Sequence, residues 1–383
     1  MSDCRKYTIL KGSKEFFDSK LKVLIKSKTL SEMNDFPQMV RSHDEYFNNI
    51  FLMVPNKEKK DPFVRTDLLV IKNSDYHSIV KTAHDRLAGV IEDLTFETAE
   101  IIIHNPTRSL EEYLESQKEL KKIEYECISQ QHNLAIAASE FNIKMKAITS
   151  KVIGQEKAIS DIGKSLWYLT KFKRIKPFVF MLYGSSSIGK TETVREIAKE
   201  FFYNSVFEKH LSMFRNERAQ YFLFGDDPNR SSIGYELLER KSNLVFLDEF
   251  DKLPDYFYSV FYTLFDNTKF SDSTYTADVS GLIIFLTSNY SNMDEMKKHL
   301  GLPIFYRIDK FVHYEDFSTD TIFSITKNEV LNYINESEGA LKFEDLWLRV
   351  RAKTNQKGEN ARTIKNIVLQ EVENILYDDV SKK

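Results

Sequence analysis

A run of small and polar residues in the middle of the chain has the composition and spacing of a phosphate-binding loop. The run is Gly184-Ser-Ser-Ser-Ile-Gly-Lys190-Thr191, which fits the pattern G-x-x-x-x-G-K-[ST]. Its glycines let the backbone curl so that successive N–H groups point inward at phosphate oxygens. Lys190 is placed to reach the outer phosphates of a nucleotide, and the Thr191 hydroxyl to contact Mg²⁺. With only 12 glycines in 383 residues, a chance match is expected in roughly one such chain in a hundred.

A phosphate-binding loop needs a strand before it and a helix after it, and the sequence predicts both. Residues 177–183 are an apolar run of the length of a buried strand. Residues 192–202 carry apolar side chains at helical spacing. The start of that helix adds unpaired N–H groups and the positive end of its dipole. Strand, glycine-bounded loop and helix together predict a nucleotide site.

Two carboxylates follow the next apolar strand, residues 244–247, and they supply what the loop lacks. Hydrolysis of a nucleoside triphosphate needs a metal holder and a positioned water in addition to a phosphate cradle. Asp248 is placed to hold Mg²⁺ through water, and Glu249 to orient and deprotonate the attacking water. We interpret the following Asp251 and Lys252 as a solvated helix start.

A third strand, residues 282–286, ends in Thr-Ser-Asn289. Ligands of open α/β sheets bind beyond the carboxyl ends of the strands, where an Asn289 amide could contact both water and the terminal phosphate. A lone asparagine after a strand is otherwise a turn residue. Arg307 and Arg362 have no such positional argument, and from chemistry alone each reads as a surface ion pair.

The bulk properties describe an ordinary water-soluble chain of two or three domains. Hydrophobic residues make up 42%, charged residues 29%, and the net charge is −3, so any contact with nucleic acid or an anionic membrane would need a local patch. Cys4 and Cys127 match no metal spacing or disulfide framework. The sequence shows neither a signal peptide nor an apolar stretch of membrane-spanning length, so we expect a cytoplasmic protein.

The N-terminal region, 1–149, predicts an α+β domain without a chemical constellation. Residues 63–71 and 99–104 are expected to be strands, with a helix over 76–94 between them. We interpret His77, His84 and His104 as ordinary surface or core histidines. From residue 107 to 149 the pattern predicts one long helix with a single apolar column at seven-residue spacing (Tyr113, Leu120, Cys127, Leu134, Phe141 and Ile148). Such a helix either connects and packs on its neighbours or, less in keeping with the half-polar second column, dimerises as a coiled coil.

From residue 150 onward, strands alternate with helices, which argues for a parallel sheet covered on both faces. A helix is expected over 156–171, an aromatic-rich helix over 256–265, and a wholly helical tail after residue 309. The predicted architecture is a P-loop α/β sheet over 150–316 with a small helical lid over 317–383.

From Val152 to about residue 376 the sequence resembles one AAA+ ATPase module of the Clp branch of unfoldases and disaggregases. Six motifs occur in the family's order. They are Val152-Ile-Gly-Gln beside the adenine, the Walker A loop 184–191, the Walker B run Leu247-Asp-Glu-Phe-Asp-Lys252, sensor 1 at 287–289, the arginine-finger segment 306–309, and sensor 2 at Asn360-Ala-Arg362.

The resemblance implies a role for each matching residue. Glu249, Asn289, Arg307 and Arg362 would be catalytic, with Arg307 reaching the nucleotide of a neighbouring subunit. Thr191 and Asp248 would hold Mg²⁺. The residues implied to contact ATP are Val152, Ile153, Gly184, Ser185, Ser186, Ser187, Ile188, Gly189, Lys190, Thr191 and Glu192. A finger acting in trans implies a ring of identical subunits, commonly a hexamer.

Departures from the family pattern limit what the resemblance implies. Ser185 and Ser187 stand where the loop usually has proline and glycine. Ser232 falls where the substrate-gripping pore loop carries an aromatic residue, and Tyr235 could replace it only if the loop is shifted by three residues. Residues 267–280 lack the apolar-Gly-Phe/Leu tripeptide of members that dock on a protease, so a protease chamber is not expected as a partner.

Three functions are compatible with these observations. The first is an ATP-hydrolysing ring that remodels a protein target chosen by residues 1–149. The second is an ATP-dependent switch or scaffold that assembles and signals without threading, which the non-aromatic pore loop favours. The third, a nucleic-acid remodeller, is disfavoured by the near-neutral charge and the lack of a basic-aromatic face.

Overall fold

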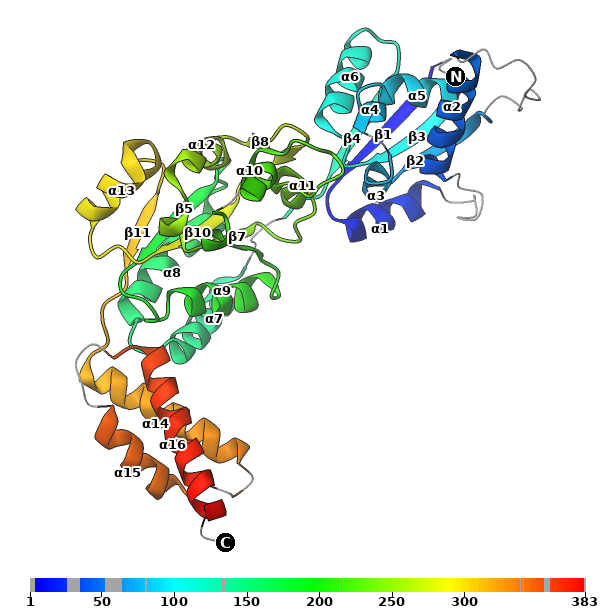
Figure 1. Ribbon diagram of the computed structural model, residues 1–383. Coiled ribbons are helices and arrows are strands. Elements are labelled where there is room, and N and C mark those ends of the chain that lie inside the picture. Colours follow the sequence, from blue (N-terminus) through cyan, green and yellow to red (C-terminus); the bar gives the residue numbers. More distant parts are fainter. Residues whose placement is uncertain are drawn as a thin grey trace. The chain divides into compact units, whose positions relative to one another are not determined.

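The computed structural model describes residues 4–25, 35–51, 64–79, 81–132, 136–215, 217–337, 339, 341–354 and 359–381 (Figure 1). The chain forms two compact units. The first comprises residues 1–133, 214–241 and 259–280, and the second comprises 134–213, 242–258 and 281–383. The sequence-based division at residue 149 treated the N-terminal region as one continuous segment. The first unit instead combines residues 1–133 with two later segments.

The first unit is built on a four-stranded sheet in the order β2-β3-β1-β4. The strands are β1 (Lys6–Lys11), β2 (Thr66–Ile71), β3 (Thr95–His104) and β4 (Glu124–Ser129), and every pairing is parallel. Helix α1 (Lys14–Leu24) packs on one face through Phe17 and Leu21. Helices α2 (Phe36–Phe51), α5 (Leu87–Leu94) and α6 (Arg108–Glu119) pack on the other. This is an α/β unit rather than the α+β domain expected.

Two predictions for this region were wrong. The helix expected over 76–94 is three short helices, α3 (Asn73–Tyr76), α4 (Lys81–His84) and α5. The single long helix expected over 107–149 is α6, then strand β4, then α7 (Ala138–Lys151). The apolar residues at seven-residue spacing thus belong to several different elements, and one of them, Leu134, lies outside the described residues. Phe63, the first residue of the strand predicted over 63–71, also lies outside them. Strand β4 forms because its backbone pairs with the distant β1, which no local periodicity can show.

Residues from later in the chain complete the first unit. They form α10 (Glu217–Phe224), α11 (Ile233–Leu238), most of α12 (Tyr258–Asp266), and the hairpin of β8 (Lys269–Ser271) and β9 (Thr276–Asp278). Ser232 caps α11, since its side chain accepts a hydrogen bond from the Tyr235 N–H. Asp272 in the hairpin turn accepts from the Gly234 N–H at 2.9 Å, which ties the hairpin to α11.

The second unit contains a five-stranded parallel sheet in the order β11-β5-β10-β7-β6. Its strands are β5 (Phe178–Tyr183), β6 (Phe207–His210), β7 (Leu244–Asp248), β10 (Ile283–Ser288) and β11 (Lys310–His313). The three central strands are buried almost throughout, as their continuous apolar sequence predicts. Because β5, β10 and β7 are neighbours, the residues that follow them meet at one edge of the sheet.

Helices α7, α8 (Glu156–Lys171), α9 (Lys190–Phe202) and α13 (Met293–Phe305) complete this sheet domain. The helix predicted over 156–171 is confirmed with the same bounds. The tail is helical, as expected, with α14 (Thr319–Glu336), α15 (Phe343–Lys353) and α16 (Ala361–Ser381) packed around their own apolar cluster (Figure 1). Strand β11, after residue 309, is the exception to the helical tail. Among the described helices, none has both the length and the apolar character needed to cross a bilayer.

Candidate functional site

The loop between β5 and α9 has backbone angles that its glycines make possible. Gly184 and Gly189 have φ of 135° and 105°, and Ser187 also adopts a positive φ. A Cβ on Gly184 would lie 2.4 Å from the Tyr314 carbonyl oxygen, so no other residue fits there without displacing the backbone. With serine at 185 and 187, the loop still has the glycine-dependent backbone at 184 and 189 and still leads directly into the N-terminus of α9, as phosphate binding requires.

Lys190 is held inside this loop. Its side chain donates to the carbonyl oxygens of Gly184 and Ser185, both at 2.6 Å, and to Asn289 Oδ1 at 3.2 Å. The residue is only 7% exposed, and burial lowers its pKa to about 8, although neighbouring carboxylates led by Asp251 act in the opposite direction. The Lys190 ammonium group is buried and donates only to neutral carbonyl oxygens among the described residues. Charged phosphate oxygens are stronger acceptors and would replace these carbonyls as its partners.

Asp248 and Thr191 meet at the end of β7. The Thr191 hydroxyl donates to Asp248 at 3.3 Å, and the Thr287 hydroxyl at the end of β10 donates to the same carboxylate. His210, the last residue of β6, has its Nδ1 3.3 Å from the other carboxylate oxygen. Hydroxyl and carboxylate oxygens at a phosphate loop are the donor set by which proteins hold Mg²⁺ beside a nucleotide.

Glu249 has a left-handed backbone, with φ of 57°. Its N–H donates to Thr287 Oγ1 at 2.9 Å, so a single hydroxyl joins Glu249 to Asp248. This conformation is unusual for a residue with a side chain and marks a position at which surrounding contacts fix the backbone. Asp248 is buried, whereas Glu249 is half-buried, and both line the same cavity.

These residues line one cavity of about 1170 Å³. Of the residues predicted to form the site, those lining it are Val152, Ile153, Ser186, Ser187, Ile188, Gly189, Lys190, Thr191, Glu192, Asp248, Glu249, Asn289 and Arg362. Gly184 and Ser185 contribute through their bonds to Lys190. Among the described residues, Arg307 is not part of this lining; its guanidinium donates to the Pro303 carbonyl oxygen at 2.6 Å.

The helical tail closes one side of the cavity. The Ala361 N–H at the start of α16 donates to the Ser187 carbonyl oxygen at 3.0 Å. Asn360 caps this helix by accepting from the N–H groups of Arg362 and Thr363, both at 3.0 Å. The Arg362 side chain is thereby carried to the cavity by the first turn of α16. Residues of α14, including Asn328 and Asn332, also line it, and no sequence signal had indicated them.

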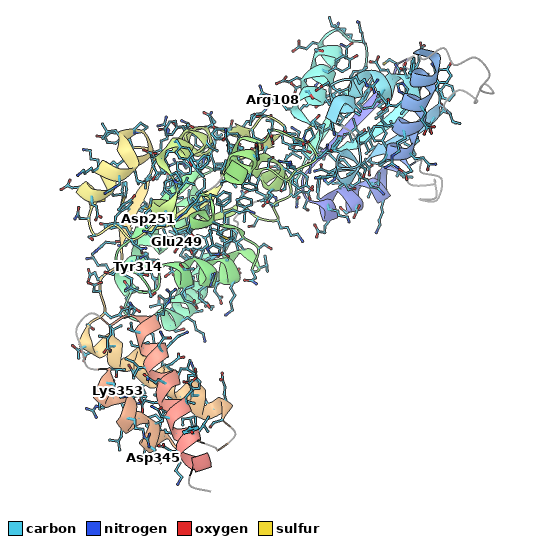
Figure 2. The ribbon with its side chains drawn as sticks, in the orientation of Figure 1. Arg108, Glu249, Asp251, Tyr314, Asp345 and Lys353 are labelled. Atoms are coloured by element: carbon cyan, nitrogen blue, oxygen red, sulfur yellow. The ribbon has the colours of Figure 1, made fainter. Side chains whose placement is uncertain are left out.

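Asp251 corrects the interpretation of the residues that follow Glu249. Its side chain is 5% exposed and paired with Lys252 at 2.8 Å, in a short 3₁₀ turn that lines the cavity beside Glu249 (Figure 2). The other carboxylate oxygen, Oδ1, is buried without a hydrogen-bond partner among the described residues. Asp251 is therefore part of the charged lining and not a solvated helix start, because the turn directs it inward. His210 and Thr287 were likewise missed as contacts of Asp248.

The sequence of this sheet domain matches a known family. Residues 180–314 fit the family described as "ATPase family associated with various cellular activities (AAA)". These residues therefore resemble an AAA domain, and the sheet domain that contains them is called the AAA domain below. The match spans β5 to β11 and thus contains the loop, both carboxylates, Asn289 and Arg307.

Proteins with related sequences extend the comparison beyond the AAA domain. The mitochondrial disaggregase of Bos taurus is 29% identical over 166 residues, which cover 39% of this chain and 24% of that protein. The chaperone protein ClpB of Bacillus cereus is 23% identical over 319 residues, covering 70% of this chain and 35% of ClpB. The chain thus matches about a quarter of the first relative's length and about a third of the second's.

A solved structure confirms the fold. The S. cerevisiae Hsp104:casein complex in its extended conformation aligns with a TM-score of 0.54 at 13% identity, covering 100% of this chain and 90% of that chain. The predicted fold, a P-loop α/β sheet with a helical lid, is therefore confirmed. The resemblance to proteins of the Clp type is confirmed by the sequence similarity to the mitochondrial disaggregase and to ClpB.

Proposed function

We propose that this chain binds ATP with Mg²⁺, hydrolyses it in a ring of identical subunits, and uses the cycle to remodel a protein target. One observation carries the proposal. Lys190, Thr191, Asp248, Glu249 and Asn289 come from three adjacent parallel strands and meet at one cavity large enough for a nucleotide. The AAA match over the same residues supports it.

The roles follow from the geometry. Lys190 exchanges its bonds with the loop carbonyls for bonds to the outer phosphates, and its positive charge offsets the negative charge that develops during transfer. Thr191 and Asp248 would hold Mg²⁺, which supplies further charge neutralisation when bound. Glu249 accepts a proton from the attacking water at its carboxylate, and Asn289, within hydrogen-bond distance of Lys190, orients that water.

Glu249→Gln tests the assignment of the base. The amide keeps the size of the side chain but cannot accept a proton, so we expect ATP binding to persist while turnover falls by roughly 10²-fold or more. Glu196→Gln, on α9 but not among the lining residues, is the matched control. The assay measures nucleotide affinity and phosphate release separately. An unchanged rate of phosphate release in Glu249→Gln would refute the role.

The ring is proposed because Arg307 lies outside the cavity lining of its own subunit. It follows α13, and the resemblance to the arginine-finger segment implies that it acts on the nucleotide of a neighbouring subunit. Arg307→Ala should then bind ATP normally and hydrolyse it poorly. Mixing it with Lys190→Ala protein should restore part of the activity, because each variant supplies what the other lacks. Failure of the mixture, where both variants assemble with wild-type subunits, counts against action in trans.

Work on a protein target is proposed from the relatives, since one is a disaggregase, another a chaperone, and the Hsp104 structure is a complex with casein. We further propose that residues 1–149 recognise the target and that the reaction takes place in the cytosol. Purification of Glu249→Gln with ATP present should trap ring and target together.

A specific observation favours the second function, a nucleotide-driven switch that does not thread its partner. Ser232 is 1% exposed and serves as the cap of α11. Tyr235, which could replace a pore-loop aromatic if the loop is shifted by three residues, packs its ring against Tyr275 and His77. The buried Ser232 and the ring contacts of Tyr235 do not favour gripping an extended chain. ATP-dependent unfolding of a captured target would favour remodelling by threading, whereas ATP-dependent assembly without unfolding would favour the switch.

A further inference from the structure

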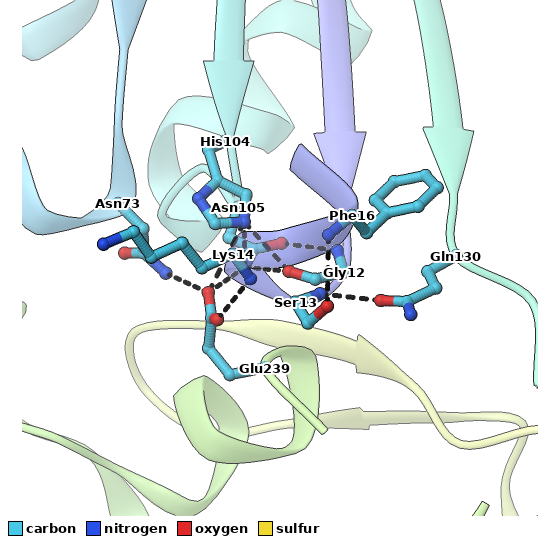
Figure 3. A network of polar contacts seen from close by, with 9 residues as sticks. All are labelled: Gly12, Ser13, Lys14, Phe16, Asn73, His104, Asn105, Gln130 and Glu239. Carbon is cyan, nitrogen blue, oxygen red and sulfur yellow. Dashed lines mark hydrogen bonds and ion pairs between the residues drawn. The ribbon is translucent and has the colours of Figure 1, made fainter. Parts of the chain in front are cut away.

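The sheet of the first unit has its own ligand-binding geometry at the carboxyl ends of its strands. Strands β1 and β3 are adjacent, but the helices that follow them, α1 and α6, pack on opposite faces. The two loops therefore diverge at the carboxyl ends of the strands, where open α/β sheets bind their ligands. We call this position between the loops the crevice. The residues there are Gly12, Ser13, Asn73, His104, Asn105 and Gln130 (Figure 3).

This crevice holds a carboxylate, that of Glu239. One oxygen accepts from the Lys14 N–H at 2.9 Å, which is an unpaired donor in the first turn of α1. The other accepts from Asn105 Nδ2 at 2.8 Å and from Asn73 Nδ2 at 3.4 Å, and it lies 3.4 Å from His104 Nε2. Glu239 follows the last residue of α11 and is more than a hundred residues from each of its donors in the sequence, so its position among them is set by the fold and not by neighbouring residues in the chain.

Contacts that do not involve the carboxylate hold its donors in place. Asn105 is fully buried with φ of 44°, and its amide exchanges two hydrogen bonds with the backbone of Gly12, at 3.0 and 2.9 Å. The Ser13 N–H donates to Gln130 Oε1 at 2.8 Å, which fixes the start of α1. Asn73 is also buried, and its Oδ1 has no hydrogen-bond partner among the described residues. An orphaned buried amide oxygen marks a site that a larger ligand with its own donor would satisfy better.

The chemistry of the donors selects the ligand. They are a backbone N–H at a helix N-terminus and two side-chain amides, with no lysine or arginine head group among them. His104 Nε2 lies 3.4 Å from the carboxylate but 2.9 Å from the Gly12 carbonyl oxygen, to which it donates. Lys11, at the end of β1, is paired with Glu111 instead. Neutral donors and a helix dipole suit a planar group of single negative charge better than a phosphate dianion.

We propose that this crevice is a carboxylate-binding site, that Glu239 is its resident occupant, and that a carboxylate of a peptide segment in a protein partner displaces it. The unpaired Asn73 Oδ1 accepts from an amide N–H of that peptide. Displacement releases the contacts that Glu239 makes at the end of α11, a helix capped by Ser232 in the stretch that resembles a pore loop. The inference rests on the proposed target recognition only for the identity of the partner; the carboxylate site stands without ATP turnover.

The test uses the full chain and chemical rescue. Glu239→Ala empties the site, and its thermal midpoint should fall by about 2–4 °C. Sodium acetate should restore part of that loss in Glu239→Ala but leave the wild-type midpoint unchanged, with sodium chloride and sodium phosphate compared at equal ionic strength. Equal effects of acetate and chloride would overturn the proposal, and a larger effect of phosphate would overturn the carboxylate assignment.

A second variant removes one donor without disturbing the fold. Lys14 is the first residue of α1, where proline is well tolerated, and Ser13 before it has an extended backbone compatible with a following proline. Adding Lys14→Pro to Glu239→Ala should abolish the acetate effect, whereas adding Lys14→Ala, which keeps the N–H, should not. Equal rescue in both double variants would refute the site.

Peptides then distinguish the source of the carboxylate. Acetyl-Gly-Glu-Gly-amide presents a side-chain carboxylate, acetyl-Gly-Gly-Gly presents a chain terminus, and acetyl-Gly-Gln-Gly-amide is the neutral control. Stabilisation of Glu239→Ala by either of the first two and not by the third supports a peptide ligand and identifies its kind. Stabilisation by all three, or by none while acetate acts, refutes the peptide part of the proposal. ATP hydrolysis measured on the same variants separates this result from any failure of the ATPase assignment.

Discussion

Thr287 connects the two acidic residues of the proposed ATPase site, and Thr287→Val tests that connection by itself. The threonine hydroxyl donates to the buried Asp248 carboxylate and accepts from the Glu249 N–H at 2.9 Å. Valine has nearly the same shape, so the substitution removes both hydrogen bonds without opening a cavity. A charge-assisted bond contributes about 1.5–3 kcal/mol, and a buried donor left without a partner costs about 1–3 kcal/mol. Because such terms are not additive, we expect a loss of about 2–4 kcal/mol in the free energy of unfolding of the second unit.

The effect on turnover should be larger than the effect on binding. Without the bond to Thr287, the Glu249 N–H loses its partner, and its left-handed backbone keeps the bond from the Lys252 N–H to its carbonyl oxygen at 2.9 Å. The backbone is then free to shift on its N-terminal side, and a displacement of about 1 Å at a catalytic group costs about 10²-fold. Lys190 and its loop are untouched, so the KM for ATP should change little while kcat falls by roughly 10–100-fold.

Thr287→Ser is the matched control, because it keeps both hydrogen bonds and loses one methyl group. Its cost should be about 1 kcal/mol of stability, with kcat close to wild type. Steady-state phosphate release gives kcat and KM, and thermal unfolding reports stability. If Thr287→Val and Thr287→Ser have the same kcat, the hydroxyl does not position Glu249 and the reasoning fails.

Two further predictions concern the phosphate loop. Burial lowers the pKa of Lys190 to about 8, so ATP affinity of the free protein should fall by roughly tenfold between about pH 7 and about pH 9, a trend that titration calorimetry should find missing in Lys190→Ala. The stability contribution has the opposite sign: the unfolded chain binds more protons between pH 8 and the ordinary lysine value of 10.5, so the free energy of unfolding from this group should rise across that window. Gly184→Ala should cost about 1–3 kcal/mol and abolish ATP binding, because its Cβ meets the Tyr314 carbonyl at 2.4 Å, whereas Gly89→Ala, with nothing within 4 Å, should be neutral or slightly stabilising by thermal unfolding.

The sequence predicted the positions of those parts of the proposed ATPase site that depend on neighbouring residues in the chain. The loop at 184–191 lies between a strand and a helix that its own neighbours specify, and Asp248 and Glu249 end a strand that is apolar throughout. Asp251 was misread because its inward direction depends on a 3₁₀ turn, which the charges of the Asp251-Lys252 pair do not reveal. Arg307 and Arg362 could be assigned only by resemblance, and the structure places Arg362 at the cavity while the role of Arg307 stays a prediction.

The N-terminal region was harder to predict because its sheet is held together by non-local pairing. Strand β4 contains Glu124 and Glu126 and lies at the edge of the sheet, paired only with β1 more than a hundred residues earlier. The sequence predicts a helix across β4 because Leu120, Cys127 and Phe141 are separated by multiples of seven residues. Leu120 is in fact exposed after the end of α6, and Cys127 is exposed on β4.

The two sheets use the same physical device with different sequence signals. In each, parallel strands bring polar groups together at their carboxyl ends, and the N-terminus of the following helix adds N–H donors. In the AAA domain the device is read from one short motif, since a triphosphate needs several backbone N–H groups from one loop. In the first unit the donors come from three loops, and the carboxylate they bind, Glu239, comes from a fourth segment. A site assembled in this way has no sequence motif. The sequence therefore predicts an ordinary histidine at position 104, whereas the structure shows His104 beside Asn105 and Glu239.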